Sequence, residues 1–162
     1  MNNKEVFGSE NGKKYDWIGK FVNGFAIVEL DGRYGFINEE FEEIVSPKYG
    51  LAYDFQNGFA RVEYNGKWGF INKEGKEIAP LKYDFAEDFY EGLAEVRVET
   101  FSAATCYYPI LYYGYVDENG NQVVPVEYNR VAHEYGTLTL SKYDEHGKIQ
   151  LESILVKDLL SK

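Results

Sequence analysis

The stretch "EYNGKWGFINKEGKEIAP" at residues 63–80 decides the fold, because it contains the two turns of a small antiparallel sheet. Asn65-Gly66 is typical of a two-residue type I′ turn, in which both central residues need positive φ. Such a turn places Glu63 opposite Trp68 and Val62 opposite Gly69. A second turn at 72–76 leads to a short strand, which we expect to end at its proline because proline cannot donate to a strand ladder.

The same pattern recurs along the chain. Tyr15, Tyr49 and Tyr83 are spaced by 34 residues, and "GRYGFINEEFEEI" (32–44) aligns with "GKWGFINKEGKEI" (66–78). Other positions that keep this spacing are Phe21, Phe55 and Phe89; Gly24, Gly58 and Gly92; Ala26, Ala60 and Ala94; and Val28, Val62 and Val96. A third copy, "YYGYVDENGNQVVP" (112–125), follows at a spacing of 45, which indicates an 11-residue insertion between Val96 and Gly114.

These spacings predict one repeat array, which we interpret as a single domain over residues 1–162, because 162 residues suit one compact core. The predicted units are a partial cap (1–14), repeat 1 (15–48), repeat 2 (49–82), repeat 3 with the insertion (83–127), and a degenerate fourth repeat (128–162). Atypical ends are expected in a repeat stack, since a terminal unit turns one face to water. The final "SILVKDLLSK" is expected to add a short helix.

The predicted hairpin has two faces. One carries Ala60, Val62, Gly69 and Ile71, and the other carries Phe59, Arg61, Glu63, Trp68 and Phe70. Both faces are at least half apolar, so we expect a neighbour on each side. Gly69 would let the adjacent repeat approach closely. Gly35 and Gly114 occupy the same position in their own repeats. We therefore interpret the aromatic–glycine pairs as the joint between repeats: Tyr34 with Gly35, Trp68 with Gly69, and Tyr113 with Gly114.

The motifs "KWGFINKEG", "RYGFINEE" and "YYGYVDENG" resemble the WG (KWG) repeat of bacterial repeat proteins. The resemblance covers residues 15–128 and departs from the motif where Tyr34 and Tyr113 replace tryptophan. It implies repeated β-hairpin units, a binding or interaction role, and no catalytic residues to carry over. Together with the 34-residue period, it predicts an all-β array of hairpin or three-stranded units, arranged as an open curved sheet or a solenoid-like stack.

The composition narrows the choice of partner. Seventeen Lys and Arg against 27 Asp and Glu give a net charge of −10, which repels phosphate backbones and acidic lipid surfaces. We therefore expect another protein as the partner, neither nucleic acid nor a membrane, and leave the oligomeric state open. Met1 is followed by no apolar leader, and the single Cys106 cannot form an internal disulfide. A cytoplasmic protein is expected, unless a secretion leader has been removed.

Few residues carry a chemical signature. The carboxylates of "YDFAEDFYEG" (83–92) lack EF-hand spacing and are interpreted as a solvated acidic connector. His133 and His146 have no zinc-ligand pattern, and Cys106 has no cationic neighbour that would activate it. Because there is also no nucleophile elbow or phosphate loop, we predict a non-enzymatic protein with no cofactor and no metal.

The insertion region "TFSAATCYYPILYY" (100–113) is the candidate binding segment, because insertions in repeat arrays form loops that often bind partners. Its aromatic and apolar side chains suit a binding surface: Phe101, Tyr107, Tyr108, Ile110 and Tyr112. The alternative is a long hairpin that covers an open sheet edge.

Three functions remain open from the sequence. The first is a WG-repeat module that binds an unidentified protein. The second is an acidic immunity-type inhibitor that neutralises a basic toxin through electrostatic steering. The third is a saccharide or cell-wall binding module, which would require a secretion leader.

Overall fold

The computed structural model describes residues 15–101 and 109–161, and almost all of its regular structure is antiparallel β. The first sheet contains β1 (Trp17–Ile18), β2 (Phe25–Leu30), β3 (Arg33–Asn38) and β4 (Glu43–Tyr49). The second contains β5 (Leu51–Ala52), β6 (Phe59–Tyr64), β7 (Lys67–Asn72) and β8 (Glu77–Tyr83). The third contains β9 (Phe85–Ala86), β10 (Leu93–Thr100), β11 (Ile110–Asp117) and β12 (Gln122–Tyr128). The fourth contains β13 (Arg130–Glu134), β14 (Thr137–Tyr143) and β15 (Ile149–Leu155).

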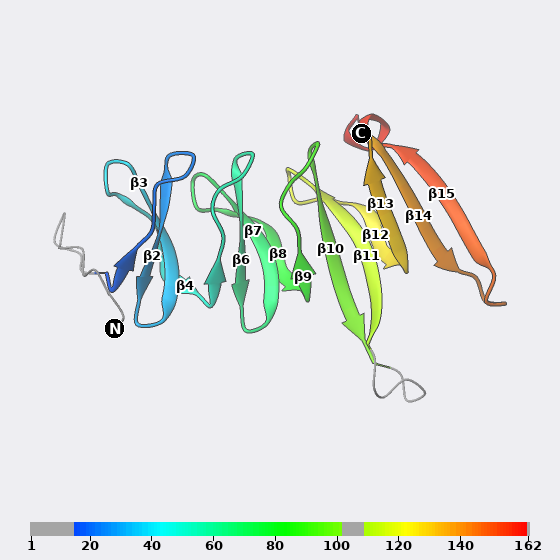
Figure 1. Cartoon of the computed structure of the whole chain (residues 1–162), viewed down its shortest axis with the longest axis horizontal. Coiled ribbons are helices and arrows are strands. Elements are labelled where there is room, and N and C mark those ends of the chain that lie inside the picture. The colour runs from blue at the N-terminus through cyan, green and yellow to red at the C-terminus, as the bar shows by residue number, and fades with distance from the viewer. Residues whose placement is uncertain (1–14, 102–108, 162) are drawn as a thin grey trace. The chain divides into compact units, whose positions relative to one another are not determined.

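In Figure 1 the strands of each sheet have neighbouring colours, since every sheet is built from consecutive strands. The prediction of an all-β array of hairpin units is confirmed. The expected helix is present as α1 (Val156–Leu160), although the start of "SILVKDLLSK" belongs to β15. Within the described part of the chain, no helix is long and apolar enough to cross a membrane.

The hairpin turns and their register are confirmed. Asn65 and Gly66 have φ values of 52° and 77°, as a type I′ turn requires, and Asp31-Gly32 behaves in the same way. The β6–β7 ladder pairs Glu63 with Trp68 and Val62 with Gly69. The β2–β3 ladder repeats this register one unit earlier.

Each of the first three sheets has four strands where three were expected. The additional strand has only two residues, as in β5, which is too short to show alternation in a sequence. The last strand of each of these three sheets also continues beyond its proline, so β8 runs past Pro80 to Tyr83. β8 lies at a sheet edge, and in the equivalent strands β4 and β12 the proline falls where the ladder shifts register, so proline is tolerated there.

The glycines of the motif do not have the neighbour that we expected. A Cβ on Gly69 would lie 2.6 Å from the carbonyl oxygen of Ala79, and one on Gly114 would lie 2.6 Å from that of Val124. Both carbonyls belong to the last strand of the glycine's own sheet, so the close approach is made within a repeat and not by the adjacent one. Glycine is needed because that edge strand is irregular and its backbone bends over the preceding strand.

Two compact units make up the chain, residues 1–82 and 83–162, and the boundary falls between the predicted repeats 2 and 3. In the first unit, the aromatic face of the first sheet packs against the small-residue face of the second. Phe55 lies at the centre of this core, with ring centroids 4.4 Å from Phe25 and 5.1 Å from Phe36. Burying each such ring contributes about 1.5–3 kcal/mol.

The second unit has a corresponding core. Leu93 and Tyr115 of the third sheet pack with Leu138 and Leu140 of the fourth, and Val156 of α1 joins them. The fourth repeat, although degenerate in sequence, therefore keeps the packing mode of the regular ones.

Candidate functional site

The insertion lengthens the β10–β11 hairpin, which Figure 1 shows as a long strand pair. Val98 pairs with Tyr112. This pair is equivalent to the Tyr64–Lys67 pair of repeat 2, which directly precedes the tight turn. Beyond it, two added pairs, Glu99–Leu111 and Thr100–Ile110, stand where repeat 2 has Asn-Gly. The insertion thus replaces a turn and leaves the remainder of the repeat intact.

The predicted binding residues are only partly described. Phe101 follows the last pair of the hairpin and is 69% exposed, whereas Ile110 and Tyr112 are half-buried in the ladder. Tyr107 and Tyr108 lie outside the described residues, as does Cys106. Phe101 is therefore the predicted binding residue with the largest described exposure, and most of an aromatic ring in water is available for association.

A polar network that the sequence did not reveal lies near this hairpin, formed by Glu87, Glu91, Glu95, Arg97, Tyr115 and His133. Arg97 is its cation. The guanidinium carbon lies 3.7 Å from the ring centroid of Phe85 and 5.7 Å from that of Tyr113. Its nitrogens lie 3.8 Å from Glu87 and 3.7 Å from Glu95, beyond hydrogen-bond length, so the attraction is electrostatic.

Glu95 is the partly buried carboxylate of the polar network. Burial raises its pKa, while the positive charge of Arg97 and a hydrogen bond donated by the Tyr115 hydroxyl oppose that rise. Burial, followed by the negative charge of Glu95, raises the pKa of Tyr115, so this hydroxyl keeps its proton and remains a donor.

His133 closes the other end of the polar network. Its Nε2 lies 3.0 Å from Oε2 of Glu91, and the imidazole contacts Tyr90 and Tyr115 edge to face, with centroids 5.1 and 6.1 Å away. His133 comes from β13, while Glu91 comes from the turn before β10, so the pair connects the fourth sheet to the third. Sequence reasoning missed this contact because the two residues are 42 positions apart and neither belongs to a repeated motif.

The acidic connector is also resolved into separate contacts. Asp84 accepts the backbone N–H of Glu99, Glu87 faces Arg97, and Glu91 faces His133. The carboxylates therefore point to different partners. Across residues 15–101 and 109–161, no three His, Cys, Asp or Glu side chains come together as metal ligands would.

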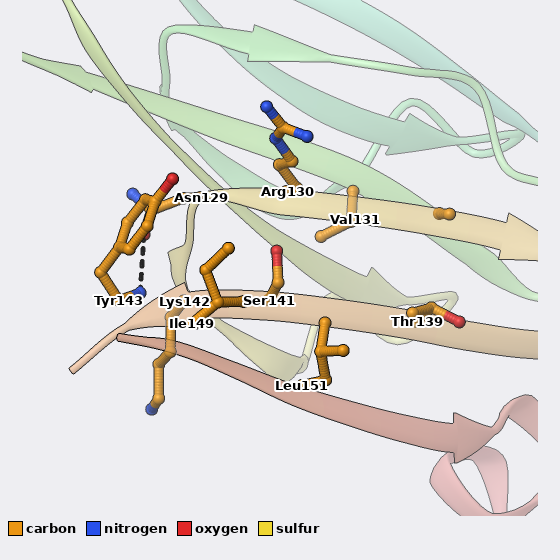
Figure 2. Close-up of a pocket in the computed structure, with 10 residues that line it drawn as sticks. Asn129, Arg130, Val131, Thr139, Ser141, Lys142, Tyr143, Ile149 and Leu151 are labelled. Carbon is orange, nitrogen blue, oxygen red and sulfur yellow. Dashed lines mark hydrogen bonds between the residues drawn. The ribbon is translucent and has the colours of Figure 1, made fainter. Parts of the chain in front are cut away.

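A hollow of about 430 Å³ lies over the fourth sheet, shown in Figure 2. Ile149 and Leu151 of β15 and Thr139 and Ser141 of β14 line it, and Arg130 stands at one side. The backbone N–H of Tyr143 donates to Oδ1 of Asn129, 3.2 Å away, which holds the end of β14 against the start of β13. Aliphatic, hydroxyl and amide groups line the hollow together with the cations Arg130 and Lys142, and none of its lining residues is a carboxylate or a histidine that could act as a general base.

Comparison with known proteins agrees with the repeat pattern. The family described as "WG containing repeat" matches at residues 13–34, 34–68, 68–99 and 113–135. No curated protein and no solved structure matches the chain. The matched segments include the three aromatic–glycine motifs and cover most of the sequence, and they leave out most of the insertion. The chain belongs to the WG-repeat family.

Proposed function

We propose that this chain is a non-enzymatic module that binds another protein through the end of the β10–β11 hairpin. The observation that carries the proposal is the exchange of a two-residue turn for a longer connection whose first residue, Phe101, is exposed. The hairpin already closes without added residues in repeats 1 and 2, so the insertion is not needed to form the sheet.

The chemistry of the partner follows from charge. Glu99 is exposed beside Phe101, and the whole chain carries a net charge of −10. An exposed carboxylate near an aromatic anchor, on a chain with this negative charge, favours a partner with a basic surface and an apolar pocket. An immunity-type inhibitor of a basic toxin is one member of this class.

The test is affinity capture with the immobilised full chain, compared with a variant in which residues 99–111 are replaced by Asn-Gly. The wild type should retain a specific basic protein, with an affinity that falls as salt increases, because exposed charge pairs are screened. The variant should lose this protein. Phe101→Ser should weaken capture and leave the melting temperature unchanged. Equal capture by wild type and both variants would contradict the proposal.

A further inference from the structure

The first three sheets protect their edges in the same two ways. At one edge stands a two-residue strand, β1, β5 or β9. At the other edge the last strand contains a proline: Pro47, Pro80 or Pro125. A very short strand offers little ladder, and a proline offers no N–H, so neither edge accepts another strand readily.

The fourth sheet has neither device. Its edge strands are five and seven residues long, and neither contains proline. The strand β15 pairs with β14 in unbroken register from Tyr143–Ile149 to Thr137–Leu155. No described strand lies on its other side. It is therefore a regular edge strand in which no proline removes a backbone donor.

Two backbone hydrogen bonds at the ends of the β14–β15 ladder show which N–H and C=O groups of β15 point toward β14. Val156 N–H donates to the Gly136 carbonyl, and Asp144 N–H donates to the Lys148 carbonyl. Even-numbered residues of β15 thus point their backbone groups toward β14. Because these groups alternate along an antiparallel strand, Ile149, Leu151, Ser153 and Leu155 point theirs outward. The side chains of Ile149 and Leu151 are 55% and 74% exposed.

The segment "KIQLE" at 148–152 is complementary to itself. When two copies run antiparallel about a two-fold axis at Gln150, Ile149 faces Leu151 and Lys148 faces Glu152, each pair occurring twice. This register joins outward-pointing residues to outward-pointing residues, so the backbone bonds of the new ladder can form. It also places opposite charges directly across the strands, where they attract.

We propose that β15 pairs edge to edge with β15 of a second copy, forming a weak two-fold dimer. The Tyr128 hydroxyl donates to Oε2 of Glu152 at 2.9 Å, which restricts the motion of this carboxylate. An interface of one strand pair is small, and the net charge of −10 opposes association, so dimers form only at high protein concentration. This inference is independent of the proposed partner site on the β10–β11 hairpin.

A charge swap tests the register. Lys148→Glu and Glu152→Lys should each weaken self-association at least about tenfold, since both attractive pairs become repulsive. An equimolar mixture of the two variants should dimerise again, because every Glu then faces a Lys. Analytical ultracentrifugation over a concentration series measures all three. A mixture that stays monomeric, or single variants that dimerise like the wild type, would overturn the proposal.

A second pair of variants tests the edge itself. Leu151→Pro removes an outward N–H and should abolish the dimer while the melting temperature stays close to that of Leu151→Thr. Leu151→Thr keeps the N–H and should retain most self-association. A wild-type chain that is monomeric at every concentration, or a dimer that survives Leu151→Pro, would show that this edge does not pair with itself.

Discussion

The hydroxyl of Tyr49, the last residue of β4, donates a hydrogen bond to Oε1 of Glu77, the first residue of β8, at 3.4 Å. Equivalent bonds join Tyr15 to Glu43 at 3.0 Å and Tyr128 to Glu152 at 2.9 Å. In each case a repeated tyrosine reaches a carboxylate in the last strand of the sheet that follows it. The tyrosine spacing in the sequence therefore marks a bond between successive elements of the array.

Tyr128→Phe is predicted to lower the free energy of unfolding by about 1 kcal/mol at neutral pH, because a hydrogen bond to a carboxylate is lost. Burial, with the Glu152 hydrogen bond next in effect, raises the pKa of Tyr128 to about 12. A raised pKa stabilises the fold below the unfolded value of about 10, and this stabilisation is lost as pH rises through the folded value.

Urea titrations from neutral to alkaline pH measure this effect. The difference between wild type and Tyr128→Phe should shrink above about pH 10. Tyr143→Phe is the control, because it removes an exposed tyrosine hydroxyl and leaves the bond between Tyr128 and Glu152 in place. A constant difference at all pH values would contradict the assignment of the alkaline transition to Tyr128.

Gly69→Val is predicted to destabilise the fold by more than about 1 kcal/mol, because its Cβ would lie 2.6 Å from the backbone oxygen of Ala79. Gly50→Ala is the matched control, since the nearest atom there is the movable Glu63 carboxylate at 2.6 Å. It should change stability by less than about 0.5 kcal/mol. Thermal melts compare the two, and equal losses would exclude a backbone clash at Gly69.

Glu95→Gln is predicted to gain stability relative to wild type as pH rises from acid to neutral. Burial raises the pKa of Glu95, so the wild-type fold is favoured while this carboxyl is protonated and loses that advantage as it ionises. Gln keeps an acceptor for Tyr115 and does not ionise. Denaturant midpoints at several pH values measure the effect. A difference that is independent of pH would show that Glu95 does not titrate with the fold.

Replacement of residues 99–111 by Asn-Gly is predicted to leave a cooperative fold with an unchanged melting temperature. Val98 and Tyr112 would then flank the same turn that closes the β6–β7 hairpin. The circular dichroism melt is the measurement. A lower melting temperature or aggregation would instead favour the alternative interpretation, in which the insertion covers a sheet edge.

Much of the local fold could be predicted because its determinants are adjacent in sequence. Asn65-Gly66 selects a turn, the turn sets the register, and the register decides which face Trp68 and Gly69 occupy. The short strand β5 and the continuation of β8 past Pro80 could not be predicted. Each of these segments lacks an alternating sequence pattern and becomes a strand because a neighbouring strand forms backbone hydrogen bonds with it.

The sequence by itself determined the period, the hairpins and the interrupted third repeat, because turn chemistry and alternation act over a few residues. Only the tertiary structure decided that the backbone near Ala79 lies against Gly69 and that Glu91 meets His133. It also decided that β15 is an edge strand of the fourth sheet among the residues that the structure describes. Such contacts join residues distant in the chain, and their energy comes from packing and charge across space, which no local spacing records.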